Sequence, residues 1–131
     1  VRNGGRLVLD AGVNLTFGAD MSVLVGAGSA LLALGTEEMH VTLDGHETFE
    51  FEVGAHVADL EFTNDTLLLP GREDYNGSVL LYTDILNGKQ DGLLARSAVP
   101  VIGGRFSDNA WHGIYIDSTA PILVQGTNIS A

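Results

Sequence analysis

Residues 92–130 read GLLARSAVPVIGGRFSDNAWHGIYIDSTAPILVQGTNIS and contain one pattern twice. Gly92–Ser97 superposes on Gly113–Ser118 at an offset of 21 residues. The same offset superposes Pro100 on Pro121 and Val101–Ile102 on Ile122–Leu123. Each copy consists of short apolar strands separated by small or polar turn residues, with no helical periodicity between them. A repeat of this length predicts a solenoid, in which successive coils stack and their strands pair in parallel.

If the two copies stack, specific pairs of residues should become neighbours. Leu93 should lie beneath Ile114 in the interior, and Arg96 beneath Asp117 on the outside. Arg96 and Asp117 are then expected to form an exposed ion pair. Such a pair contributes about 0.5 kcal/mol and reports the register more than it stabilises the fold.

The N-terminal half contains a shorter module, of 16 to 18 residues. Its copies are Leu7–Gly12, Val23–Gly28 and Val41–Gly45, each followed by a second strand, at 13–17, 30–34 and 48–53. Glu61–Asp65 resembles Arg105–Asn109, and the apolar run Thr66–Leu69 follows it. We predict further coils there, interrupted by a loop at Pro70 to Gly77 that stands off the solenoid wall.

Four runs of this chain resemble a known family of repeats. They are DAGVNLTFGAD (10–20), GSALLALGTEE (28–38), FSDNAWHGIYIDS (106–118) and TAPILVQGTNIS (119–130). They are similar to the right-handed parallel β-helix repeats of the pectate-lyase-like superfamily, in particular those of prokaryotic secreted and surface proteins. The resemblance implies an all-β, single-stranded right-handed parallel β-helix of about six to seven coils. It implies a fold, and no particular activity.

Composition sets further limits. The 131 residues are 45% apolar, with 17 glycines for corners, which suits one domain over 1–131. We expect this to be a piece or one subunit of a longer solenoid. Without cysteine there is no disulfide framework, and no apolar run reaches the roughly 18 residues of a membrane span.

The net charge of −11 disfavours nucleic acid as a partner, because an acidic surface repels phosphate. Only one of the six basic residues, Lys89, is a lysine. An acidic surface with almost no lysine also resembles the surfaces of proteins from high-salt organisms, so a halophilic source is one interpretation. Plain acidic solubility is the other.

Enzymes of the resembling family place an Arg or Lys base beside acidic Ca²⁺ ligands, or use paired aspartates, in a lateral groove. The nearest mixed clusters in this chain are Asp84 with Lys89 and Asp91, and Arg105 with Asp108. Neither supplies three carboxylates, and the aspartate pairs are absent. We therefore expect no catalytic residues and no cofactor. A fragment of a polysaccharide-binding or polysaccharide-cleaving protein stays open as the alternative.

The four histidines raise the question of a metal. His40 follows Glu38 by two residues, so the two could share a strand face, but the other histidines are scattered. Asp and Asn residues at corners are explained by turn formation, and the glycine-rich Ca²⁺ nonapeptide is missing. We expect no metal site.

Three aromatic residues are candidate carbohydrate contacts, because exposed rings stack on sugars. They are Tyr75 in the predicted loop, Trp111 at a corner and Tyr115 at an outward strand position. The alternative is that each covers a neighbouring coil.

Four of the seven asparagines stand in Asn-x-Ser/Thr sequons, more than chance predicts: Asn14, Asn64, Asn76 and Asn128. The alternative is that Asn, Ser and Thr all favour solenoid corners. Occupied sequons would place the protein outside the cell.

Neither end of the predicted solenoid shows a capping helix in this sequence, so either the caps lie in further sequence or another subunit covers the ends. An uncapped solenoid exposes a rung of unpaired backbone groups and the cross-section of its core. We therefore expect an extracellular or cell-surface structural or adhesive module that self-associates through its open ends, for example into a fibre or surface layer, with glycans as a further kind of partner.

Overall fold

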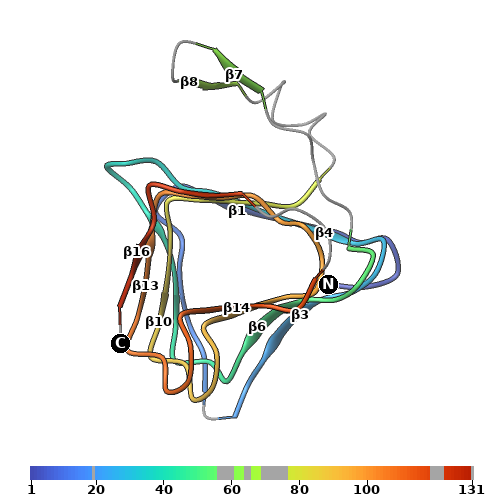
Figure 1. Cartoon of the computed structure of the whole chain (residues 1–131), viewed down its shortest axis with the longest axis vertical. Coiled ribbons are helices and arrows are strands. Elements are labelled where there is room, and N and C mark those ends of the chain that lie inside the picture. The colour runs from blue at the N-terminus through green and yellow to red at the C-terminus, as the bar shows by residue number, and fades with distance from the viewer. Residues whose placement is uncertain (19, 56–60, 64–65, 69–76, 119–122, 131) are drawn as a thin grey trace.

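The computed structural model describes residues 1–18, 20–55, 61–63, 66–68, 77–118 and 123–130. In this part of the chain every regular element is a β-strand, and three parallel sheets enclose one interior (Figure 1). These residues contain no helix long and apolar enough to cross a membrane.

The strands of each sheet lie in the following spatial order. Sheet A contains β1 (Arg6–Asp10), β4 (Ala30–Leu34), β9 (Val79–Leu81), β12 (Val101–Ile102) and β15 (Val124–Gln125). Sheet B contains β2 (Asn14–Thr16), β5 (Val41–Asp44), β10 (Thr83–Leu86), β13 (Arg105–Ser107) and β16 (Asn128–Ile129). Sheet C contains β3 (Val23–Val25), β6 (Phe49–Phe51), β11 (Leu93–Ala95) and β14 (Ile114–Ile116).

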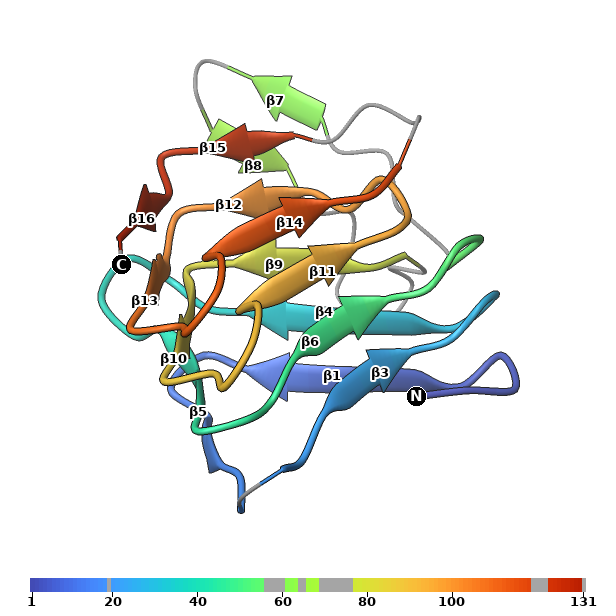
Figure 2. The same ribbon diagram turned by 60° about the horizontal axis from the view of Figure 1, so that its bottom comes forward.

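The chain visits the three sheets in rotation. Strands β1, β2 and β3 enter sheets A, B and C in turn, and β4, β5 and β6 repeat the order one layer on. Figure 2 shows the layers stacked. This all-β arrangement of parallel strands is consistent with a parallel β-helix. Its sheets hold four or five described strands each, against the six to seven coils expected.

The register predicted for the two copies of the repeat is confirmed between β11 and β14. Leu93 pairs with Ile114 and Ala95 with Ile116, in parallel and in the predicted register. Gly92 precedes β11 where the next layer comes very close. A Cβ atom there would lie 2.7 Å from the Gly113 carbonyl oxygen, so only glycine fits without a shift.

The offset changes after β14. Val101 pairs with Val124 and Ile102 with Gln125, so the expected pairing of Val101–Ile102 with Ile122–Leu123 is wrong by two residues. The 23-residue offset persists from β13 to β16, where Arg105 pairs with Asn128. The connection after β14 is therefore two residues longer than the equivalent one before it. Pro121, expected to superpose on Pro100, lies outside the described residues.

The prediction that each coil of the N-terminal half is 16 to 18 residues long is also wrong. Leu7–Gly12, Val23–Gly28 and Val41–Gly45 fall on sheets A, C and B. The observed offsets are 24 residues in sheet A, 28 in sheet B and 26 in sheet C. The short module is a strand-and-corner unit that occurs on all three sides, so its spacing measures a part of one turn.

The two described strands between β6 and β9 are not part of the parallel sheets. β7 (Glu61–Thr63) and β8 (Thr66–Leu68) pair antiparallel as a hairpin on the outer side of sheet A, which corrects the coils expected there (Figure 1). Of the loop expected at Pro70 to Gly77, only Gly77 is described. Pairing then resumes, with Val79 beside Leu32.

The interior is filled by apolar side chains from all three sheets. The largest are Phe49, Phe51 and Phe106, each fully buried. Stacked in register, these side chains form a continuous column, which is what holds successive layers together.

A second apolar cluster lies on the outer face of sheet A. Its members are buried on the side away from the interior: Ala30, Leu32, Leu34, Val79, Leu81 and Ile102. The three inner strands of sheet A, β4, β9 and β12, are thus buried on both faces. The sequence indicates this burial, because β4 reads ALLAL and β9 reads VLL, and such unbroken apolar runs are typical of strands buried on both faces.

We predict that Leu32→Ala lowers the free energy of unfolding by about 2–4 kcal/mol, as for a core leucine, although the side chain points away from the interior. The matched control is Leu94→Ala on the outer face of sheet C, where Leu94 is only half-buried and about 1 kcal/mol is expected. Urea unfolding of the two variants measures both values. Equal losses would contradict burial of the outer face of sheet A.

Candidate functional site

Aromatic side chains gather at the corner between sheets B and C, close to the C-terminal strands. The backbone N–H of Trp111 donates to the carbonyl oxygen of Gln90 in the layer before, which fixes the corner. Trp111 is 65% exposed and Tyr115 45% exposed, and the rings of His112 and Tyr115 lie 5.3 Å apart. This aromatic corner, Trp111 with His112 and Tyr115, offers ring faces to solvent.

A carboxylate holds the imidazole of this corner. His112 Nδ1 lies 2.6 Å from Asp91 Oδ1, and Asp91 is only 8% exposed. A hydrogen bond to one ring nitrogen sets the tautomer and the ring orientation. The residues are 21 positions apart, the repeat offset itself, so superposing Gly92 on Gly113 already brings Asp91 to His112.

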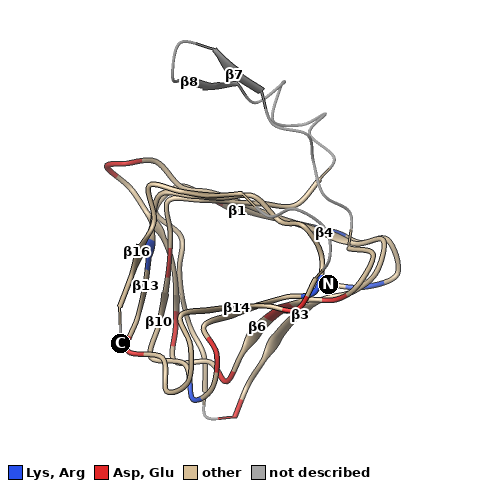
Figure 3. Ribbon diagram, in the orientation of Figure 1, with Lys and Arg blue, Asp and Glu red and all other residues tan. Residues whose placement is uncertain are grey.

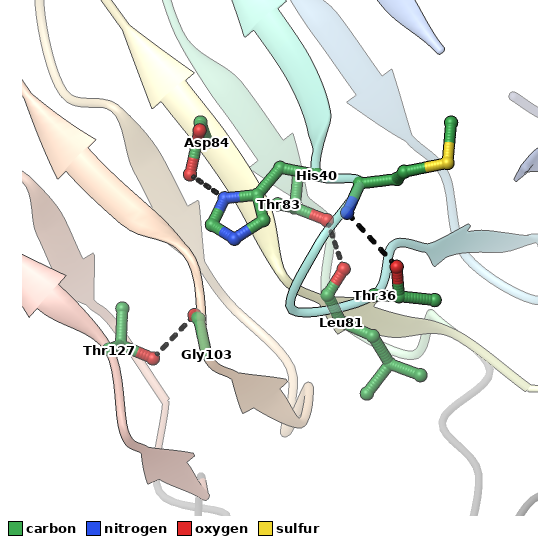
Figure 4. A network of polar contacts seen from close by, with 8 residues as sticks. Thr36, His40, Leu81, Thr83, Asp84, Gly103 and Thr127 are labelled. Carbon is green, nitrogen blue, oxygen red and sulfur yellow. Dashed lines mark hydrogen bonds and ion pairs between the residues drawn. The ribbon is translucent and has the colours of Figure 1, made fainter. Parts of the chain in front are cut away.

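A second histidine and carboxylate meet at the corner between sheets A and B (Figure 4). His40 Nδ1 lies 2.8 Å from Asp84 Oδ1, joining two layers. Nearby hydroxyl groups satisfy backbone groups of the same corner, with Thr83 donating to the Leu81 carbonyl and Thr127 to that of Gly103. The partner of His40 is therefore Asp84, not Glu38, with which it was considered as a metal ligand.

The residues of the first mixed charge cluster considered for catalysis each pair with a residue outside that cluster. Asp84 pairs with His40, Asp91 with His112, and Lys89 with Asp20 at 2.9 Å. Arg105 lies in β13, in register between Asp84 and Asn128. Among the residues described, no three His, Asp or Glu side chains come together in a group able to hold a metal ion.

Arg96 makes an ion pair, but with a different partner from the one expected. Its Nε lies 2.8 Å from Glu50 Oε1, so the expected pair with Asp117 is wrong. Arg96 follows β11, whose Leu94 pairs with Glu50, so the guanidinium turns back to the layer before. Arg96 and Asp117 line an open hollow of about 570 Å³, together with Val53, Ser97, Ile116 and Ser118.

Two of the predicted glycosylation sites are exposed on sheet B. Asn14 in β2 and Asn128 in β16 occupy opposite ends of one outward row, Asn14, Thr42, Asp84, Arg105 and Asn128. Both asparagine side chains are accessible to solvent. Asn64, Asn76 and Tyr75 lie outside the described residues.

The sheets end in two sets of edge strands. The N-terminal edge is β1, β2 and β3, and the C-terminal edge is β15, β16 and β14. Of the twelve large apolar side chains that are exposed in the described residues, these six strands carry seven: Leu7, Val8, Leu24, Tyr115, Ile116, Val124 and Ile129. The exposed apolar surface is thus concentrated at the two ends.

One edge strand is partly paired. The Val1 amino group donates to the Leu24 carbonyl at 2.7 Å, and the Gly26 N–H donates to the Val1 carbonyl at 2.8 Å. Val1 therefore lies along β3 as a short cap of sheet C. No described strand pairs with the outer edges of β1 and β2.

We predict that Asp91→Asn lowers the free energy of unfolding by about 1–2 kcal/mol, because a charge-assisted hydrogen bond to His112 becomes a neutral one at a nearly buried site. Asp108→Asn is the matched control. Asp108 is exposed with φ of 57°, a conformation that asparagine also adopts readily. Chemical denaturation at neutral pH measures both variants, and equal effects would count against a stabilising Asp91–His112 bond.

Comparisons with protein-family models, with curated proteins and with solved structures found no match. The function is therefore inferred from the molecule itself, from four features: the arrangement of the sheets, the aromatic corner, the exposed asparagines and the two apolar edges.

Proposed function

We propose that this chain is a non-catalytic structural or adhesive module, a single-stranded right-handed parallel β-helix whose two edges bind further copies of itself. The observation that carries the proposal is the concentration of exposed apolar side chains on the N-terminal and C-terminal edges. An open parallel edge offers unpaired N–H and C=O groups to another strand, and exposed apolar surface beside it favours association.

The register of the sheets supports stacking of a second copy. Inward positions form apolar columns, such as Leu15, Leu43, Ile85, Phe106 and Ile129 in sheet B. If the N-terminal edge of one copy pairs with the C-terminal edge of another, Leu15 of the one follows Ile129 of the other. In sheet C, Val23 would likewise follow Ile114. The column continues without a polar side chain.

The distribution of charge also favours this contact. Residues 1–36 contain two acids and two bases, Asp10, Asp20, Arg2 and Arg6. Residues 92–131 are balanced in the same way, by Asp108, Asp117, Arg96 and Arg105. The whole net charge of −11 therefore belongs to residues 37–91, among them Glu37 and Glu38 at the projecting corner after β4 (Figure 3). Neutral ends meet without the repulsion that an acidic surface would cause.

Val1 sets a limit on how the copies meet. Its pairing with Leu24 and Gly26 occupies part of the edge of β3. Strands β1 and β2 are then the first to accept a neighbour, and β14 of the next copy competes with Val1 for β3. Assembly through sheets A and B alone still aligns the inward columns of both sheets.

We predict that the purified chain forms species larger than its monomer mass of 13.8 kDa, and that Val124→Asp returns it to monomer. A carboxylate at the centre of an apolar edge loses its hydration without a partner, so association should weaken at least tenfold, on the order of 1.4 kcal/mol or more. Size exclusion with light scattering and electron microscopy measure the effect. The matched control is Val53→Asp, at an exposed valine outside the six edge strands.

The same experiment separates this proposal from the second candidate, a polysaccharide-binding or polysaccharide-cleaving β-helix fragment. The aromatic corner favours that candidate, because exposed rings beside an oriented imidazole suit contacts with sugars. A wild-type chain that stays monomeric, and that binds or cleaves an acidic polysaccharide with or without Ca²⁺, would overturn the structural proposal. Assembly that Val124→Asp abolishes would support it.

We also propose an extracellular or cell-surface location, supported by the sequons. Asn14 and Asn128 are exposed and lie on a strand face that solvent reaches. We predict that protein secreted from a glycosylating host carries extra intact mass, and that Asn14→Gln or Asn128→Gln removes one glycan each. Asn3→Gln is the control, since Asn3 is exposed and outside any sequon. An unmodified intact mass would contradict the glycoprotein assignment.

A further inference from the structure

His46 is a buried histidine whose imidazole ring makes no hydrogen bond. It lies at the corner between β5 and β6 and is 0% exposed. Neither ring nitrogen has a hydrogen-bond partner. The ring stacks on Phe17 with centroids 5.8 Å apart and lies 6.4 Å from the ring of Phe49. A buried polar group without a hydrogen-bond partner lowers the stability of the fold, so the buried imidazole destabilises the closed structure.

The backbone of the same corner is held firmly between layers. The His46 carbonyl accepts a hydrogen bond from the Lys89 N–H at 3.0 Å, and the Glu47 N–H donates to the Met21 carbonyl at 2.7 Å. The imidazole therefore cannot leave the interior by a local flip of its corner. It can reach water only if a neighbouring layer moves.

The layers on the two sides of His46 differ in how deeply they are buried. On the C-terminal side, β10 and β11 contribute Ile85 and Leu93, both fully buried. On the N-terminal side, β2 and β3 form the edge, and Phe17 itself is only partly buried. The smallest movement that exposes the ring of His46 is therefore an opening of the N-terminal edge at Phe17 and Met21.

Charged groups from each packed element face this corner. Asp44 of β5 is the one that favours a charged imidazole, and Glu47 of the same corner is bonded to the amide of Gln90. Asp20 of the N-terminal edge and Lys89 of the following layer are paired with each other on the surface. That pair spans the corner from outside and is well exposed, so it contributes little.

Burial determines the protonation of His46. Desolvation lowers the pKa of His46 below its ordinary 6.5, against smaller opposing effects of its own backbone and of Asp44. A depressed pKa in the closed state means that protons bind preferentially to the open state. The closed state is therefore fully favoured above pH 6.5 and loses stability as the pH falls below it.

We propose that His46 makes the N-terminal edge acid-labile: below about pH 6.5, protonation of the imidazole opens β2 and β3 from β5 and β6, while the later layers stay closed. The device regulates the edge through which we propose that copies stack, and to that extent it rests on the proposed function. The opening itself depends only on the fold.

Hydrogen exchange of the dilute, monomeric chain at pH 7.5 and 5.5 tests the opening directly. After correction for intrinsic rates, amides of β2 and β3 should exchange about tenfold faster at pH 5.5, and those of β10 and β11 should not. His46→Phe, which keeps a ring against Phe17, should abolish the increase. His112→Gln and His40→Gln, at the two histidines paired with carboxylates, should retain it.

An increase that persists in His46→Phe, or no increase in the wild type, would overturn the proposal. If His46→Phe does not fold, an NMR titration of the wild-type imidazole decides. Titration of His46 in the folded chain well below 6.5 supports the device, and titration at or above 6.5 overturns it. Loss of assembly in acid is a separate readout, so failure of stacking and failure of the switch are distinguishable.

Discussion

In-register parallel pairing of successive layers is the constraint on which the rest of this structure depends. Because Leu93 pairs with Ile114 and Ala95 with Ile116, inward positions fall on inward positions, and the interior becomes one apolar column. A slip of one residue would turn every such side chain to solvent. Close glycines such as Gly92 and short corners follow from the same requirement, because the layers must approach to within strand-pairing distance.

The sequence predicted this constraint where the repeat is regular. Gly92–Ser97 and Gly113–Ser118 gave the correct pairs, and their offset even brings Asp91 to His112. It did not predict the coil length of the N-terminal half, because the same strand-and-corner unit occurs on all three sides and a short spacing looks like a full turn. The hairpin of β7 and β8 was missed for a related reason, since three apolar or alternating residues fit a ladder or a hairpin equally well.

The polar contacts were the least predictable part. His40 and Asp84 are 44 positions apart because a long segment separates their layers in sequence, and they meet because β5 and β10 pair. Arg96 pairs with Glu50 and not with Asp117 because two neighbouring layers both offered a carboxylate and side-chain direction decided between them. The buried outer face of sheet A was visible in principle in the unbroken run Ala30–Leu34, which a strand with one solvated face would not contain.

The excursion between β6 and β9 has a consequence for how such a chain can change. Val79 returns to Leu32 in register after 47 positions, whereas Val101 follows Leu80 after 21. The ladder thus constrains where the strand comes back, whatever the number of residues in between. This corner is a natural insertion point, where segments of different length or chemistry can be grafted while the layers on either side keep their pairing.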